Sequence, residues 1–181
     1  MKKEYFFVVL VFLSVLMLPA LVLGYSETFV SFLSPGSDEL VGGVVDFLKF
    51  NADLSEEFTS DMKSHFHDVR LVMVFGWLLV FSTVAGLFYA RVDYNKVFWQ
   101  SGVSICGFLV FLTSWILIDF DSLFTVFHLL LFPQGNWQFP SDSIIISLFP
   151  QEFFITTAII CVVFSFLIGV GLVVYSLFCN N

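Results

Sequence analysis

Two histidines in apolar surroundings are the residues whose types and spacing could perform chemistry. His65 directly precedes a long apolar stretch, and His128 lies inside a run of Phe and Leu residues. A buried imidazole is costly unless it finds a hydrogen-bond partner. Imidazole is also the side chain whose pKa suits proton transfer near neutral pH. We therefore treat His65 and His128 as candidate acid/base residues, provided that the fold brings them to the same side of the molecule.

Carboxylates accompany the first histidine. In a helix, Asp61 and Asp68 lie four residues before and three residues after His65, so both flank it on one face. A neighbouring carboxylate fixes the tautomer of an imidazole and raises its basicity, as a general base requires. The same helical period turns His67 away, and we expect His67 to be exposed. An alternative interpretation of the segment is a solvated collar of charges before a membrane span.

Amide and indole groups follow the second histidine. Gln134, Asn136 and Trp137 lie in a turn-forming segment that also contains Pro133 and Gly135. Amide N–H groups can stabilise a developing oxyanion, which acyl chemistry requires. Gly and Asn are also ordinary turn-forming residues, so the turn alone is a simpler explanation for them.

The composition indicates an integral membrane protein. Of 181 residues, 59% are hydrophobic, 26 are Phe and only 12% are charged. One soluble domain of this length cannot bury so much apolar surface. The three cysteines, Cys106, Cys161 and Cys179, have no disulfide-type spacing and are expected to be small hydrophobic residues.

Four apolar stretches are long enough to cross a hydrocarbon core of about 30 Å as helices. They are residues 5–23, 71–90, 97–118 and 153–178. The first also resembles a secretory signal, but its apolar part is longer than usual, so we expect an uncleaved anchor. The predicted fold is all-α: a four-transmembrane-helix bundle formed by a single membrane domain, residues 1–181.

The charge distribution predicts the orientation of this bundle. One side contains Lys2, Lys3, Arg91 and Lys96 against two acids, and the other contains three basic residues against thirteen acids. Because basic residues near span ends favour the cytoplasm, we expect residues 1–4, 91–96 and 179–181 to be cytoplasmic. Residues 24–70 and 119–152 are then extracytoplasmic. No basic patch is available for nucleic acid.

Each extracytoplasmic segment has a predicted role. In residues 24–70, an amphipathic helix that Asp38 can cap is expected to lie on the membrane or cover the bundle. Residues 119–152 form the loop that carries His128. The second and third spans are joined by about six residues and should be antiparallel neighbours. His65 and His128, at the outer ends of these spans, are therefore predicted to form a pair.

The motifs around the histidines resemble those of a known family, the lipoprotein intramolecular transacylases (Lit). The resemblance lies in Ser64-His65-x-x-Asp68-Val69-Arg70, Phe124-x-x-Phe127-His128-x-x-x-Phe132-x-x-x-x-Trp137-x-Phe139 and Leu148-Phe149-Pro150-x-x-Phe153-Phe154. It implies that His65 and His128 are the essential pair. It also implies that Asp68, Arg70 and Trp137 support the site, with Asp61 and Asn136 as further candidates from the spacing above.

The resemblance also implies an activity. Members of the family act at the outer face of the cytoplasmic membrane on diacylglyceryl-modified lipoproteins. They move an ester-linked acyl chain from the glycerol to the amine of the N-terminal cysteine, which gives a lyso-form lipoprotein. The expected partners are this lipoprotein and membrane lipids, and neither a cofactor nor a metal is expected.

Other interpretations of the histidine pair remain open from the sequence. Two histidines from neighbouring helices could ligate a haem in an electron-transfer protein, and zinc could use a third ligand among Asp61, Asp68 and His67. Water in place of the amine would make the protein a hydrolase, and a four-span scaffold would need no chemistry. A transporter is not favoured, because no span contains a charged residue at mid-depth.

Overall fold

The computed structural model describes residues 2–178, and within that range the chain is helical, with no strand. Four helices are long and apolar enough to cross a membrane: α1 (Lys2–Gly24), α4 (Ser60–Tyr89), α5 (Tyr94–Ile118) and α8 (Gln151–Phe178). Four shorter helices lie between them: α2 (Glu27–Leu33), α3 (Asp38–Leu48), α6 (Phe120–Leu131) and α7 (Ile144–Leu148). The all-α, four-span fold class is confirmed. The predicted cytoplasmic position of residues 179–181 falls outside the described residues.

α4 is longer than a membrane span requires. Its 30 residues correspond to about 45 Å of helix, against the roughly 20 residues that cross a bilayer. The charged residues Asp61, Lys63, Asp68 and Arg70 all lie in its first eleven residues. The uncharged, apolar part of α4 therefore follows Arg70, and His65 lies on the part that precedes it.

The structure divides into two compact units, each with segments from several helices. The first contains residues up to 20, 75–117 and from 159 onward; the second contains residues 21–74 and 118–158. The predicted single membrane domain, with its exact span limits, stays a prediction. Every candidate site residue belongs to the second unit.

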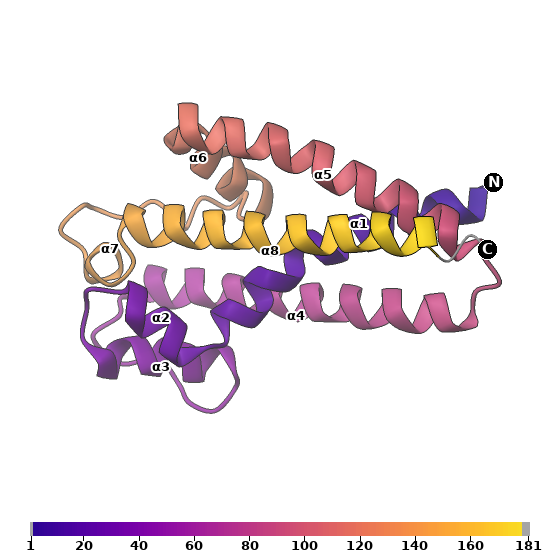
Figure 1. Ribbon diagram of the computed structural model, residues 1–181. Helices are drawn as coiled ribbons and strands as arrows, with labels where there is room; N and C mark the ends of the chain where they lie inside the picture. Colours follow the sequence, from indigo (N-terminus) through magenta and orange to yellow (C-terminus); the bar gives the residue numbers. More distant parts are fainter. Residues whose placement is uncertain (1, 179–181) are drawn as a thin grey trace. The chain divides into compact units, whose positions relative to one another are not determined.

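The first unit is built around a core shared by α1 and α5. Its buried members are Phe7, Val11, Val15, Val97, Ile105 and Leu109. Partly buried residues of α4 and α8 pack against this core. In Figure 1, α1 crosses behind α8, and Ser165 of α8 donates a hydrogen bond to the carbonyl of Val15 at 3.0 Å. Polar groups within a membrane need such internal partners, because lipid provides none.

α5 and α8 approach closely at two glycines. A Cβ atom added to Gly102 would lie 2.6 Å from the carbonyl oxygen of Gly169 and 2.7 Å from a methyl group of Val173. Membrane helices commonly use small residues in this way, since packing rather than hydrophobic burial holds them together. The glycines thus set the distance between the two helices in the first unit.

The second unit contains the amphipathic helix that the sequence predicted. α3 begins with Asp38 and Glu39 in its first turn and buries one apolar face through Val41, Val44, Val45, Phe47 and Leu48. Figure 1 shows α2 and α3 beside the first turns of α4. The hydroxyl of Ser34, which follows α2, donates to the carbonyl of Leu148 in α7.

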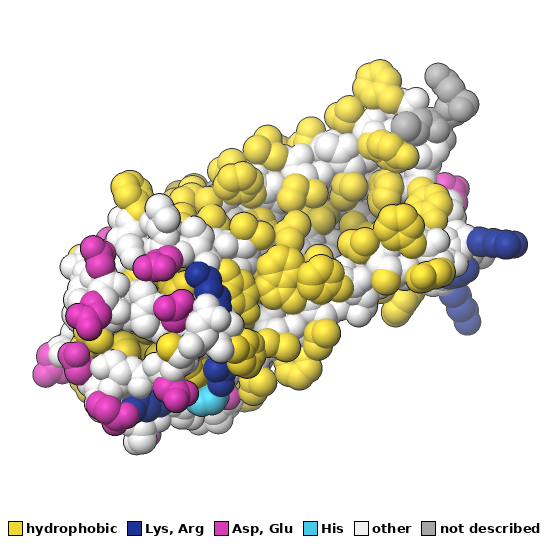
Figure 2. Space-filling model, turned by 90° about the horizontal axis from the view of Figure 1, so that it is seen from below, with side chains coloured by type: hydrophobic (Ala, Val, Ile, Leu, Met, Phe, Trp, Pro, Cys, Tyr) yellow, Lys and Arg dark blue, Asp and Glu magenta, His cyan; other side chains and the backbone are white. Residues whose placement is uncertain are grey.

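Hydrophobic and acidic side chains occupy different parts of the surface. Large apolar side chains stay exposed along the spans, among them Phe81, Phe88 and Phe111. On the face shown in Figure 2, hydrophobic side chains cover much of the surface and most of the acidic ones gather in one region. Exposed apolar surface on this scale is expected where lipid, not water, surrounds a protein.

Candidate active site

α6 is a short helix that holds His128. Its N-terminus is capped by Asp119, whose carboxylate accepts the backbone N–H of Ser122 at 3.0 Å. Its outward face is apolar and exposed, whereas His128 points inward and is 6% exposed. A second link to the unit comes from Gln151, whose amide donates to the carboxylate of Asp121 at 2.6 Å. These contacts fix the direction in which α6 presents its histidine.

The two histidines lie face to face in the second unit. The ring centroids of His65 and His128 are 6.2 Å apart, with 27° between the ring planes. Both rings are buried, His65 being 8% exposed. The structure therefore brings together two imidazoles that are 63 positions apart in the sequence.

The tautomer of His128 follows from its hydrogen bond. Its Nδ1 lies 2.8 Å from the carbonyl oxygen of Phe124, one turn earlier in α6. A carbonyl oxygen can only accept, so Nδ1 carries the proton and donates it. The lone pair of His128 is then on Nε2, which is the atom that can take up a proton from a substrate.

His65 has an incomplete set of partners. Its Nδ1 is buried without a hydrogen bond in the described structure, and so is the side-chain oxygen Oδ1 of Asn136. The Asn136 amide nevertheless interacts favourably with the ring, since it raises the pKa of His65.

Burial keeps both rings neutral near pH 7. It lowers the pKa of His65 to about 4, with a further lowering from the nearby His128 and opposing contributions from Asp68 and Asn136. Burial also lowers the pKa of His128, against an opposing contribution from its hydrogen bond to Phe124. Desolvation is the largest cause for each ring, because it disfavours the charged form.

Asp68 ties the loop after α6 to α4. One of its carboxylate oxygens accepts hydrogen bonds from the amides of Gln134 at 2.5 Å and Asn136 at 2.6 Å. Asn136 also donates to the hydroxyl of Ser64 at 3.1 Å. Gly135, between the two amides, has a φ of 81°, which a glycine adopts without strain. The expected amide donors for an oxyanion are therefore already engaged by Asp68.

Aromatic rings surround the pair. The ring of Phe132 is 4.9 Å from that of His65 and 5.6 Å from that of His128, and Phe124 approaches His128 to 3.9 Å. The Trp137 ring is 4.8 Å from His128, and the Phe139 ring is 5.8 Å from His65. Such walls exclude water from the imidazoles and offer apolar surface to an acyl chain.

Arg70 and Asp61 lie apart from the pair. The guanidinium of Arg70 stacks 3.9 Å from the ring of Phe47 and donates to the Phe47 carbonyl at 3.3 Å, so it contacts α3. It also donates to Nδ1 of His67 at 3.1 Å. His67 is exposed, as its helical position indicates, and Asp61 is exposed without a hydrogen bond or ion pair to the described residues.

The structure places two residues at the site to which sequence reasoning assigned no role, and it changes the role of a third. Ser64 accepts a hydrogen bond from Asn136, and the Phe132 ring contacts both histidine rings. Gln134, expected as an oxyanion donor, donates to Asp68 instead. Ser64 and Phe132 belong to the motifs that resemble those of the Lit family, and this membership was the signal that could have identified them. Nothing in the sequence specified their partners.

The described residues do not form a metal site. No group of three His, Cys, Asp or Glu side chains within residues 2–178 is placed to hold a metal ion.

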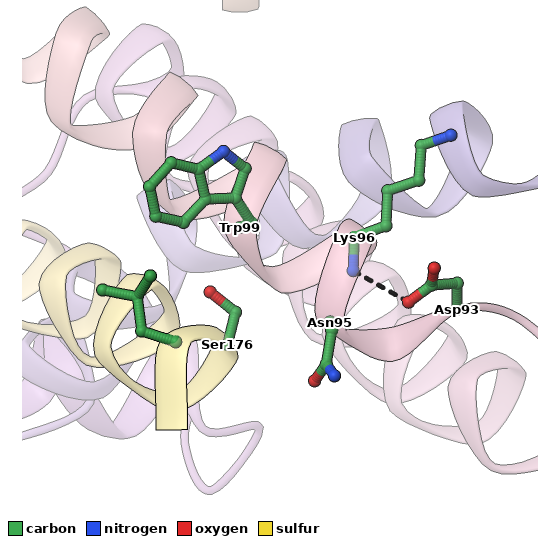
Figure 3. Close-up of a pocket in the computed structure, with 6 residues that line it drawn as sticks. Asp93, Asn95, Lys96, Trp99 and Ser176 are labelled. Carbon is green, nitrogen blue, oxygen red and sulfur yellow. Dashed lines mark hydrogen bonds between the residues drawn. The ribbon is translucent and has the colours of Figure 1, made fainter. Parts of the chain in front are cut away.

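The first unit contains a hollow that has no histidine in its lining. Its volume is about 380 Å³, and it is lined by Asp93, Asn95, Lys96, Trp99, Ser176 and Leu177. Figure 3 shows the Lys96 side chain extending away from Trp99 and Ser176, while its backbone N–H donates to Asp93 at 3.0 Å.

Comparison with known proteins identifies the family. The sequence profile of the family described as lipoprotein intramolecular transacylase Lit matches residues 39–154, which include both histidines and their motifs. The chain belongs to the Lit family. The resemblance inferred from the motifs is confirmed, and a multi-pass membrane protein follows from the family and the four apolar helices.

Two individual proteins are similar to this member of the Lit family. The solved structure of the membrane-integral lipoprotein intramolecular transacylase Lit from Bacillus cereus superimposes with a TM-score of 0.76 at 19% identity, covering 98% of this chain and 94% of that one. This likeness shows the fold. An uncharacterized protein from Aquifex aeolicus (strain VF5) is 26% identical over 117 residues, or 62% of this chain and 53% of that protein. The match thus spans about half the length of that relative.

Proposed function

We propose that this chain is an acyltransferase that converts diacylglyceryl lipoproteins to the lyso form. It moves an ester-linked acyl chain from the glycerol to the α-amine of the same molecule. The observation that carries the proposal is the pair of buried, neutral imidazoles 6.2 Å apart, enclosed by aromatic rings, in a member of the Lit family. Diacylglyceryl lipoproteins and membrane lipids are the partners that this function requires.

The proton balance of the reaction explains why two neutral imidazoles are useful. The amine, with a pKa of about 8, is mostly an ammonium at pH 7 and must lose one proton before it attacks the ester carbonyl. The nitrogen loses a second proton as the carbon–nitrogen bond forms and the bond from carbon to glycerol oxygen breaks. One of these protons reaches the departing glycerol oxygen, and the other goes to solvent.

The geometry suggests how His65 and His128 divide this work. His128 offers its Nε2 lone pair, because its Nδ1–H is held by the carbonyl of Phe124. Donation to that carbonyl also stabilises the imidazolium formed when Nε2 takes a proton, so His128 is suited to accept a proton and release it to the glycerol oxygen. His65, whose pKa is lowered to about 4, is uncharged in the resting site but is a weak base, so its neutral ring serves as a hydrogen-bond partner that orients the amine while the other proton goes to solvent.

Beyond proton transfer, much of the rate acceleration comes from holding the reacting groups close together. The amine and the ester belong to one molecule, so the protein needs only to hold them in a reactive arrangement. Such positioning contributes about 7 kcal/mol or more in well-oriented reactions. The Asp68 hydrogen bonds hold the loop after α6 against α4, the Phe132 ring contacts His65 of α4, and the Trp137 ring packs on His128 of α6. We propose that these contacts, with Asn136, shape the space in which the substrate is positioned.

The site is proposed to face the outside of the cytoplasmic membrane. Lys3 donates to the carbonyl of Arg91 at 3.4 Å, so the N-terminus and the loop at 91–96 lie at one side of the first unit. That side contains Lys2, Lys3, Arg91 and Lys96. By the positive-inside rule we propose that residues 1–4 and 91–96 are cytoplasmic and that residues 24–70 and 119–152, which carry the histidines, are extracytoplasmic.

The experiment is a mass assay on a synthetic diacylglyceryl lipopeptide with a free N-terminal amine. Transfer leaves the total mass constant and removes the reactivity of the amine, whereas hydrolysis lowers the mass by one acyl chain. We expect transfer by the wild type and a loss of about 100-fold or more in His65→Ala and in His128→Ala, as for removal of an acid/base group.

His67→Ala is the matched control, because His67 is exposed on the same helix and contacts Arg70 and Phe47 rather than the pair. Its turnover should equal that of the wild type. Full turnover in His65→Ala or His128→Ala contradicts the role of that histidine. Loss of one acyl mass in the wild type contradicts transfer and favours the hydrolase.

A further inference from the structure

Some hydrogen-bond donors near the histidine pair already have an acceptor, and one does not. The side-chain amides of Gln134 and Asn136 both donate to Asp68, and Asn136 donates to Ser64 as well. An amide that already serves a carboxylate has no reason to exchange it for a less charged acceptor. Asn136 thereby uses both of its N–H groups, and the second N–H of Gln134 belongs to an exposed side chain that water can reach. A buried donor for the reacting carbonyl therefore has to come from elsewhere.

Trp137 has such a donor. Its Nε1 is buried and has no hydrogen-bond partner among the described residues. An indole N–H can only donate, so it has no alternative way to be satisfied. Buried polar groups are almost always paired in folded proteins, and an unpaired one calls for an explanation such as a catalytic role. A Trp that merely anchors a protein at the membrane surface keeps this N–H in contact with water.

The position of Trp137 connects the unpaired donor to the pair. Its ring is 4.8 Å from that of His128, with 36° between the planes, and 6.4 Å from that of Phe124. The backbone next to it is fixed, because the neighbouring Asn136 is held on α4 by Asp68 and Ser64. The indole is thus part of the same wall as the proton-accepting imidazole.

The chemistry at this place creates the acceptor that Trp137 lacks. When the amine attacks the ester, the carbonyl oxygen gains negative charge, and a preorganised donor in a site that excludes water stabilises it strongly. We propose that Trp137 is a catalytic residue whose Nε1–H donates to this oxyanion. The inference rests on the proposed acyl transfer and adds the group that stabilises its tetrahedral intermediate.

The test is Trp137→Phe, which keeps an aromatic ring and removes the N–H. We expect kcat for the lipopeptide to fall by about 100-fold, as for loss of one oxyanion donor, while KM changes by less than about threefold. The thermal unfolding midpoint in detergent should stay within about 3 °C of the wild type. Trp115→Phe, in α5 and the other unit, is the control and should keep full kcat.

A binding measurement gives a second, independent readout. The probe is a lipopeptide whose scissile ester is replaced by a phosphonate, which carries a negative oxygen where the intermediate would. We expect the indole N–H proton of Trp137, assigned by its absence in Trp137→Phe, to move downfield on binding in the wild-type protein. We also expect Trp137→Phe to bind the phosphonate about 100-fold more weakly.

The outcomes separate this inference from the function on which it rests. A kcat in Trp137→Phe within threefold of the wild type overturns the inference, and so does an unmoved indole resonance with bound phosphonate. If those results accompany normal transfer by the wild type and its loss in His65→Ala, the acyltransferase stands without Trp137. A raised KM with unchanged kcat assigns Trp137 to substrate binding alone and also overturns the inference.

Discussion

At the scale of single residues, desolvation decides the charge of the candidate catalytic groups. His65 and His128 are among the few buried polar side chains of the described residues, and burial lowers the pKa of each. A charged ring would lose its hydration without a carboxylate in direct contact. Asp68 is close enough to raise the pKa of His65, but its own hydrogen bonds go to Gln134 and Asn136.

The depressed pKa of His65 predicts how stability depends on pH. The folded protein leaves His65 neutral down to about pH 4, whereas the unfolded chain takes up a proton near pH 6.5. Unfolding is therefore coupled to proton uptake, and the free energy of unfolding should fall as the pH falls from about 6.5 to about 4. We expect the thermal unfolding midpoint in detergent to decrease over that range.

The comparison variant is His65→Phe, which fills the same apolar surroundings without a titrating group. Its midpoint should fall less between pH 6.5 and 4 than that of the wild type. Equal decreases of the midpoint in the two proteins would show that the burial of His65 does not contribute to the loss of stability at low pH.

At the scale of elements, Arg70 joins α3 to α4. Its guanidinium lies between the rings of Phe47 and Phe50, at 3.9 and 4.4 Å. Phe50 follows α3 with a φ of 64°, a conformation that few residues other than glycine adopt. The planar guanidinium stacks on two rings and also donates to the Phe47 carbonyl. A lysine ammonium is not planar and could not make both kinds of contact in this way. Arg70 therefore contacts α3 rather than the histidine pair, and its support of the site stays a prediction.

The close contact between α5 and α8 predicts that a larger residue at Gly102 destabilises the protein. Gly102→Ala places a methyl group 2.6 Å from the backbone of α8, and backbone cannot move aside as a flexible side chain would. We expect a loss of about 1–3 kcal/mol in the free energy of unfolding, as for overpacking of a tight interface. Thermal or denaturant unfolding in detergent measures it.

Gly107→Ala is the matched control in the same helix. A Cβ atom there meets nothing within 4 Å, so the change should be neutral or slightly stabilising, because Ala has the higher helix propensity. A Gly102→Ala protein as stable as Gly107→Ala would mean that the two helices are not in close contact.

At the scale of the whole molecule, charge is divided between the two units. Thirteen of the fifteen acids belong to the second unit; the other two are Glu4 and Asp93. The basic residues Lys2, Lys3, Arg91 and Lys96 belong to the first. Since basic loops stay in the cytoplasm, this asymmetry predicts the orientation of the protein.

Labelling in intact cells tests that orientation. With the native cysteines replaced by serine, we expect a cysteine at Asp142 to react with a membrane-impermeant maleimide and one at Asp93 to react only after the membrane is opened. Asp142 is an exposed residue of the second unit. Labelling of position 93 but not 142 in intact cells would invert the topology and place the histidines in the cytosol.

Much of the fold could be predicted because membrane helices depend on local properties. Apolar length determines the four spans, and the turn before Asp38 indicates where the amphipathic helix begins, although its N-cap is Ser37 and not Asp38. The meeting of His65 and His128 was also predicted, from a short loop between the second and third spans and from a position of His128 in the loop at the end of the third span. The structure instead places His128 on a separate short helix, α6, because Asp119 caps a new helix after α5. The structure places their rings 6.2 Å apart.

The sequence by itself determined the spans, the family and the identity of the two histidines, because hydrophobic length and residue type are properties of the chain. Only the tertiary structure decided which partners the polar groups take. It directs the amides of Gln134 and Asn136 to Asp68, turns Arg70 to α3, and leaves the indole N–H of Trp137 unpaired beside His128. A hydrogen bond depends on ångström-scale distances between segments far apart in the chain, and spacing along a sequence does not specify those distances.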